Sequence, residues 1–291
     1  MNAQIKTLID IAGSRGAMSE KQKAILFEKA KISGEDIEII EDLLTEKKIS
    51  IQPNIPAIDP DEDLVWFIAA CDLAMQPPMP EDMRYYSCVA LCALDAVFSI
   101  RTRYEPVVIN LLHRFCAQYR INHLFAPNPH QMPVRDQQLT LSELRRRMMG
   151  VTGGALSEIL QNRQRTSTRN GILKAEAFMR YLDVMNDYHI DTYQDLNEVV
   201  ERPGFEGRLR QISGQNVSVD YFFMLAGNKN DVKVDTHIRR FAEGAIGRDL
   251  NNQEIKQLFA DAVTFYRRNG YSTMTARHLD HIVWSWQKGQ K

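Results

Sequence analysis

Apolar residues recur at helical spacing along almost the whole chain. In the first fifty residues this pattern predicts three short helices between residues 2 and 47, with Ser19 as the N-cap of the second. No series of alternating, strand-like runs is present, so the predicted fold class is all-α. Further helices are predicted at residues 64–75, 85–98, 104–119, from 143 after an N-cap at Ser142, and at 172–186, 193–200, 217–225, 238–245, 253–267 and 276–286.

A proline-rich stretch interrupts this pattern near the N-terminus. Pro53, Pro56 and Pro60 lie between residues 51 and 62, and prolines at this density are typical of a linker. We therefore expect an N-terminal helical accessory segment at residues 1–50, a linker at 51–62, and one larger domain at 63–291. The accessory segment has either a structural role or a role in docking a protein partner.

Charge is distributed unevenly along the chain, which has 291 residues and a net charge of −1. Residues 1–63 contain 8 Lys and Arg against 13 Asp and Glu, whereas the remainder contains 28 against 24. The larger segment is thus mildly basic, which is compatible with a nucleic-acid partner. No apolar run reaches the roughly 18 residues of a membrane span, and the first residues do not resemble a signal peptide, so we expect a cytoplasmic protein without membrane contact.

The four cysteines, Cys71, Cys88, Cys92 and Cys116, lie in apolar helical surroundings. Buried thiols are the expected state of such residues in a reducing compartment. Because no His or Cys at suitable spacing completes a ligand set, we expect no metal and no cofactor.

A helical hairpin with residue types suited to phosphate binding is predicted around residue 214. One amphipathic helix ends at Ile212, and the next begins at Val217. Gly214 and Asn216 tolerate positive φ, which allows a tight turn with outward backbone N–H groups. Such groups, together with a helix N-terminus, attract a phosphate without reading base sequence. The predicted DNA-contacting residues are Ser213, Gly214, Gln215, Asn216 and Ser218.

Three segments of the chain carry a resemblance to a known family. Residues 212–216 match a hydrophobic-x-Gly-x-Gly hairpin, with Asn216 in place of the second glycine, and residues 234–237 read Val-Asp-Thr-His. Together with residues 94–102, they resemble the helix-hairpin-helix (HhH-GPD) DNA glycosylase superfamily, in particular the endonuclease III and adenine glycosylase group. The resemblance runs from about Asp63 to Lys291, and it implies a two-lobed helical fold with an N-terminal extension and double-stranded DNA as partner. The iron–sulfur loop of some relatives is missing, because no cysteine follows Cys116.

The resemblance also implies roles for individual residues. Asp235 is the candidate catalytic carboxylate, which would stabilise an oxocarbenium-like sugar and orient a water molecule; taken alone, an Asp at this position is usually a helix N-cap, and the two roles are compatible. Ser218 occupies the position of the lysine with which some relatives form a Schiff base, so a monofunctional glycosylase with weak or no AP-lyase activity is implied. Arg101 lies where many relatives fill the gap left by the extruded base, although an arginine paired to a carboxylate is an equally good interpretation.

Four further residues are candidates for a base-binding pocket: Tyr85, Tyr104, Asp220 and His237. Core packing is the alternative for the tyrosines, an ion pair with arginine for Asp220, and a structural hydrogen bond for His237. The alternative function is a non-catalytic helix-hairpin-helix module that binds DNA within a larger assembly. The base recognised is not specified by the sequence, since scattered pocket contacts determine it.

Overall fold

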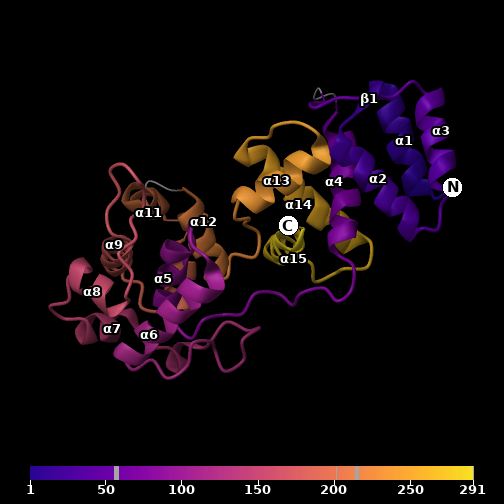
Figure 1. Cartoon of the computed structure of the whole chain (residues 1–291). Helices are drawn as coiled ribbons and strands as arrows, with labels where there is room; N and C mark the ends of the chain where they lie inside the picture. The colour runs from indigo at the N-terminus through magenta and orange to yellow at the C-terminus, as the bar shows by residue number, and fades with distance from the viewer. Residues whose placement is uncertain (56–58, 201, 214–215, 291) are drawn as a thin grey trace. The chain divides into compact units, whose positions relative to one another are not determined.

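The computed structural model describes residues 1–55, 59–200, 202–213 and 216–290, and this part of the chain is mostly helical (Figure 1). It contains fifteen α-helices, the π-helix η1 (Tyr104–Ile109) and the 3-10 turn η2 (Arg135–Gln137). Two short strands, β1 (Ala17–Met18) and β2 (Ser50–Ile51), pair in parallel. The predicted all-α class is confirmed. Within the described ranges, no helix combines the length and the apolar character that crossing a membrane requires.

The helices divide into two compact units. Unit 1 comprises residues 1–81 and 232–291, and unit 2 comprises residues 82–231. Packing defines this division, whereas the linker at residues 51–62 was predicted from composition. The N-terminal helices therefore share a unit with the last sixty residues of the chain.

Unit 1 is built around α4 (Pro60–Ala74), which contacts five other helices. Its apolar residues form one core in which Phe67 makes edge contacts with Phe241 and Phe259. Ser19 caps its helix through a capping box with Gln22, as predicted. The other helices of unit 1 are α1 (Ala3–Arg15), α2 (Glu20–Ile32), α3 (Ile37–Glu46), α13 (Thr236–Ile246), α14 (Asn252–Arg268) and α15 (Ala276–Gly289).

The N-terminal segment holds the C-terminal end of α13. The side chain of Gln22 donates from Nε2 to the carbonyl of Ile246 at 3.1 Å, and the Ile55 amide donates to the carbonyl of Gly247 at 2.8 Å. Gly247 has φ 83° and closes the helix in the left-handed conformation that favours glycine. Residues 1–55 therefore fix the helix whose first turn carries Asp235.

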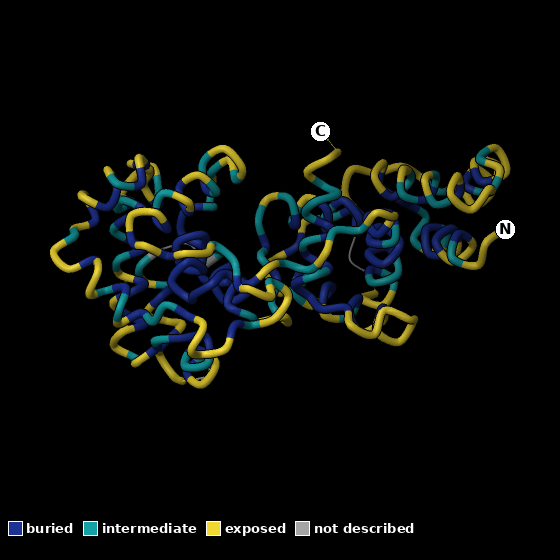
Figure 2. The backbone as a smooth tube through the Cα atoms, turned by 90° about the horizontal axis from the view of Figure 1, so that it is seen from below, coloured by how far each residue is buried: buried dark blue, intermediate teal, exposed yellow. Residues whose placement is uncertain are grey.

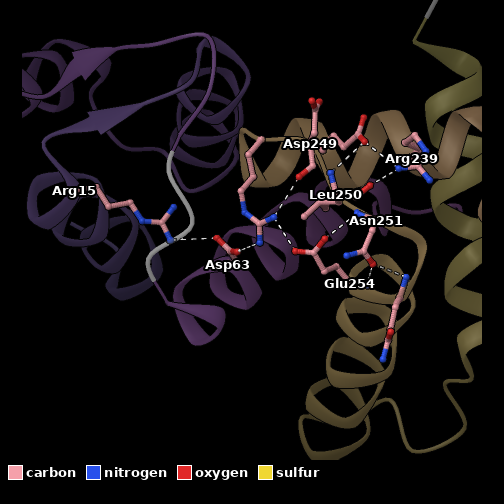
Figure 3. Close-up of polar contacts among 10 residues, drawn as sticks. Arg15, Asp63, Arg239, Asp249, Leu250, Asn251 and Glu254 are labelled. Carbon is pink, nitrogen blue, oxygen red and sulfur yellow. Dashed lines mark hydrogen bonds and ion pairs between the residues drawn. The ribbon is translucent and has the colours of Figure 1, made fainter.

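An ionic network centred on the buried Asp63 links the two chain segments that make up unit 1. Asp63 accepts from Arg15 at 3.2 Å and from Arg248 at 2.9 Å, and its side chain is only 7% exposed. Figure 3 shows Arg15 and Asp63 facing each other from α1 and α4. Arg248 also donates to Glu254, which accepts from the Asn251 amide at the start of α14. The network thus joins α1, α4 and the loop before α14.

Unit 2 is built around α5 (Val89–Ser99), in which every residue from 89 to 98 is buried. In Figure 2 such buried positions alternate with exposed ones along the outer helices, as expected for amphipathic helices that cover a core. The helix α9 (Lys174–Asp187) packs against α5 and three other helices. The remaining helices of unit 2 are α6 (Asn110–Gln118), α7 (Leu141–Arg147), α8 (Gly153–Ile159), α10 (Tyr193–Val199), α11 (Phe205–Ser213) and α12 (Asn216–Leu225).

Three local predictions in unit 2 were wrong in part. The helix predicted over residues 85–98 begins only at Val89. The helix predicted over residues 104–119 begins as the π-helix η1 before it continues as α6. The predicted cap, Ser142, lies inside α7, and Thr140 is the N-cap, with its hydroxyl accepting from the Glu143 amide. Ser142 instead donates to Asp191 at 2.7 Å. Thr140 and Ser142 are both residue types that cap helices, and the hydroxyl of Ser142 is instead engaged by Asp191, far along the chain.

Candidate functional site

Asp235 is the N-cap of α13. Its Oδ1 accepts from the amides of His237 at 2.8 Å and Ile238 at 3.1 Å, and the side chain is partly exposed. No described residue donates a hydrogen bond to its second oxygen, Oδ2. The carboxylate is therefore held in place through one oxygen at the positive end of a helix dipole, while the other oxygen is available to a ligand.

His237, two residues farther on, is half-buried in the first turn of α13. Its ring makes an edge contact with Trp284 of α15, at 5.9 Å between ring centroids. This contact packs the ring against a neighbouring helix.

The predicted hairpin corresponds to α11, which ends at Ser213, and α12, which begins at Asn216. The two helices contact each other. Gly214 and Gln215 lie outside the described residues, as do the side chains of Ser213 and Asn216. The helix–turn–helix spacing of the prediction is thus present, whereas the geometry of its turn is not described.

Two predicted residues of α12 are buried and bonded within unit 2. The hydroxyl of Ser218 lies 3.2 Å from that of Tyr181, and Ser218 is 2% exposed. Asp220 accepts from Arg210 of α11 at 2.7 Å. Of the two interpretations of Asp220, the ion pair with an arginine is the one that the structure contains.

Arg101 is exposed in the turn between α5 and η1. Its φ is 54°, a left-handed conformation that non-glycine residues rarely adopt. No carboxylate in the described part of the chain pairs with its guanidinium. Lys174, the first residue of α9, donates to the carbonyl of Ile100 and to the side-chain hydroxyl of Thr102, the residues on either side of Arg101.

Lys174 is a functional candidate that the sequence analysis did not find. Its ammonium lies within 3.1 Å of four acceptors, the carbonyls of Phe98 and Ile100 and the side chains of Thr102 and Gln164. Lys174 is 3% exposed, and none of these four groups is negatively charged. Burial, followed by the positive charge of Arg101, lowers the pKa of Lys174 to about 8. No signal in the sequence distinguishes this lysine from a solvated one at the start of a helix.

Of the two predicted pocket tyrosines, Tyr104 belongs to a polar cluster in the core of unit 2, and Tyr85 packs elsewhere in that core. Tyr85 is buried and packs edge-on against Tyr193. Tyr104 is partly buried, and its hydroxyl donates to Oδ2 of Asp95 at 3.1 Å. The hydroxyls of Tyr86 and Tyr221 donate to the same oxygen at 2.8 and 3.3 Å.

Asp95 at the centre of this cluster was also missed as a candidate. It is fully buried. Burial and then the charge of Asp95 raise the pKa of Tyr86 and of Tyr104, so both phenols remain neutral donors. The signal was visible in the sequence, because a lone Asp inside the apolar run of residues 89–98 needs hydrogen-bond partners.

Two cavities, one in each unit, lie away from the predicted residues. One of about 520 Å³ in unit 1 is lined by Asp63, Arg248 and Glu254 among others, and one of about 390 Å³ in unit 2 lies over residues 126–137. Among the described residues, no group of His, Cys, Asp and Glu is arranged to hold a metal ion. The four cysteines are free and buried, as predicted, and burial raises the pKa of Cys88 to about 11.

Comparison with known proteins gives a family without an assigned function. No curated protein and no solved structure matches the chain significantly. A family model described as a domain of unknown function, DUF8548, matches residues 66–288. The match includes α5 to α14, most of α4 and all but the last residue of α15, whereas α1 to α3 lie outside it. Since it covers more than half of the sequence, the chain belongs to the DUF8548 family.

Proposed function

We propose that this protein is a monofunctional DNA glycosylase of the helix-hairpin-helix type, in which Asp235 assists hydrolysis of the N-glycosidic bond of a damaged or modified base. The observation that carries the proposal is the state of the Asp235 carboxylate. One of its oxygens is fixed by two amides of α13, and the other accepts no hydrogen bond from any described residue. A fixed, partly exposed carboxylate of this kind suits stabilisation of developing positive charge on a sugar.

The remaining residues support this reaction through DNA binding. The helices α11 and α12 have the spacing of a backbone-binding hairpin, and the exposed, left-handed Arg101 presents a planar cation from a turn. Base release requires the nucleotide to leave the stack, and a guanidinium can stack or hydrogen-bond in the gap. Ser218 has no amine with which to form a Schiff base, and its buried hydroxyl contacts that of Tyr181, which favours direct attack by water.

A panel of duplexes, each with one lesion or modified base, tests the proposal. Incubation followed by alkali should cleave at least one member of the panel at the modified position. Borohydride should trap no covalent protein–DNA adduct, because no imine forms. Asp235→Asn should abolish base release while it retains DNA affinity, and equal loss of both properties would contradict the assigned role.

The second candidate is a helix-hairpin-helix module that binds DNA without catalysis. Two observations favour it: the cap contacts of Asp235 explain this residue without any reaction, and Asp220 is neutralised by Arg210. A broad panel that yields no alkali-labile site, from a protein that binds duplex DNA, would select this candidate.

A further inference from the structure

A compact hairpin-like loop precedes α9 in unit 2. Arg165 and Leu173 form an antiparallel bridge, and the Thr166 amide donates to the Ile172 carbonyl at 2.9 Å. The guanidinium of Arg165 also donates to the Gly171 carbonyl at 2.7 Å. A Cβ on Gly171 would lie 2.2 Å from the backbone nitrogen of Ser167, so the turn closes only around a glycine. The loop therefore has a defined shape.

The tip of this loop presents polar side chains to solvent. Thr168, Arg169 and Asn170 are exposed, and no hydrogen bond or ion pair joins their side chains to another described residue. Hydroxyl, amide and guanidinium groups are the side-chain donors that proteins use to contact phosphate oxygens. This tip thus presents donors suited to an anionic ligand.

The loop is joined to the turn that carries Arg101. The hydroxyl of Thr102 donates to the side chain of Gln164 at 2.8 Å, and Lys174 bonds to both of these groups and to the carbonyl of Ile100. An ammonium has three N–H donors, and here it faces four acceptors, so it is fully used in holding the two segments together. The turn that carries Arg101 and the base of the loop are consequently bonded to the same buried group.

The joined segments carry an excess of positive charge. Residues 98–105 and 158–174 together contain six basic residues and two acidic ones, Glu105 and Glu158. Glu158 pairs with Arg163, while Arg101, Arg103 and Arg169 have no carboxylate partner in the described part of the chain. Since Lys174 also lacks a carboxylate among its four partners, its buried charge adds to the local positive potential.

We propose that residues 101–103 and 164–171 form one surface, the two-loop surface, that binds the phosphodiester backbone of double-stranded DNA, and that Lys174 is its positioning residue. The inference rests on the nucleic-acid partner of the proposed function, but it requires no catalysis. It adds a second backbone contact in unit 2, built from different residues than the α11–α12 hairpin.

The decisive experiment measures binding of the full chain to an unmodified duplex by fluorescence anisotropy over a series of salt concentrations. In the double variant Arg103→Ala/Arg169→Ala, the plot of the logarithm of the binding constant against the logarithm of the salt concentration should become less steep. The magnitude of its slope should fall by about one for each phosphate that the variant no longer neutralises. Arg146→Ala is the matched control, because Arg146 is an exposed arginine of unit 2 that already pairs with Glu143. It should leave the slope unchanged. Identical slopes for the double variant and the control would overturn the proposal.

Variants of Lys174 test its positioning role. Lys174→Met removes every donor to the two segments and should weaken DNA binding, whereas Lys174→Arg retains a cationic donor and should restore much of it. A rescue of this kind distinguishes loss of loop positioning from loss of core volume. If Lys174→Met does not fold, as judged by circular dichroism, the exposed arginine variants still decide the question.

The same variants separate this inference from the proposed function. If the protein releases no base but its salt slope depends on Arg103 and Arg169, the two-loop surface is supported and the glycosylase assignment is contradicted. If the protein releases a base but the salt slope is unchanged in these variants, the glycosylase assignment is supported and the two-loop surface is contradicted.

Discussion

Replacement of Asp63 by Asn should destabilise unit 1 strongly, because this carboxylate balances two arginines in a nearly solvent-free position. The Arg15 side chain is 2% exposed and that of Asp63 is 7% exposed. An Asn side chain has nearly the same size, but it brings an uncharged oxygen to one arginine and N–H donors towards the other. Arg15 would remain buried with only Glu62 as an ionic partner.

The size of the effect follows from burial. Removal of one member of a buried ion pair typically costs about 3–5 kcal/mol, since the remaining charge stays buried without compensation. Because Arg15 retains Glu62 and Arg248 retains Glu254, we expect the lower end, about 3 kcal/mol. The exposed pair of Lys47 and Asp10 is the matched control: both side chains are more than one-third exposed, so Asp10→Asn should cost at most about 1 kcal/mol.

Tryptophan fluorescence during urea unfolding is a suitable assay. The chain has 3 tryptophans, Trp66, Trp284 and Trp286, and all of them lie in unit 1. The signal therefore reports unit 1 separately from unit 2. With a typical dependence of about 1–3 kcal/mol per molar urea, the loss in Asp63→Asn should lower the midpoint by roughly 1–3 M. If Asp63→Asn and Asp10→Asn unfold at the same urea concentration, the reasoning about burial is refuted.

Three further predictions concern the caps and the buried lysine. Asp235→Asn should change the stability of unit 1 by no more than about 1 kcal/mol, since Asn caps a helix as well as Asp. The same variant should lower the rate of base release at least about 100-fold. The control is Asp36→Asn at the cap of α3, which should leave base release intact in the lesion assay. Gly247→Ala should destabilise unit 1 more than Gly16→Ala does in the tryptophan fluorescence assay. Both glycines have positive φ, which an alanine adopts only with strain. In addition, a Cβ on Gly247 would lie 2.9 Å from a neighbouring side chain, whereas a Cβ on Gly16 would meet nothing within 4 Å. Because Lys174 has a folded pKa of about 8, below the roughly 10.4 of an unfolded lysine, the unfolded state binds more protons between these values. The stability of unit 2 should therefore rise with pH across this window, and thermal melts of Lys174→Met followed by circular dichroism should lack the rise.

The elements of the fold were largely predictable because helical periodicity and capping are local properties. The predicted buried helix around residue 94, the cap at Ser19 and the start of α13 at Asp235 all depend on a few neighbouring residues. The errors were small: of two hydroxyl residues two positions apart, the wrong one was chosen as the cap of α7, and a π-helical start was read as α-helix.

The candidate site was predictable only in part, because its hydrogen bonds join residues far apart in the sequence. The ammonium of Lys174 bonds to groups that lie more than seventy residues earlier, and Tyr221 reaches Asp95 across more than a hundred. A single sequence contains no record of such pairs. The position of Asp235 at a helix N-terminus was evident from local residues, but its participation in a reaction is a matter for the experiments above.

The interrupted course of the chain through unit 1 has a consequence for its synthesis. Unit 2 is one uninterrupted segment and is complete once residue 231 is made, whereas residues 1–81 must await helices made only at the end. The 210 residues from 82 to 291 take about 10–40 s at typical translation rates of about 5–20 residues per second. During this interval the apolar face of α4 that later packs on α13 to α15 has no native cover, so nascent chains should engage chaperones chiefly through their first eighty residues.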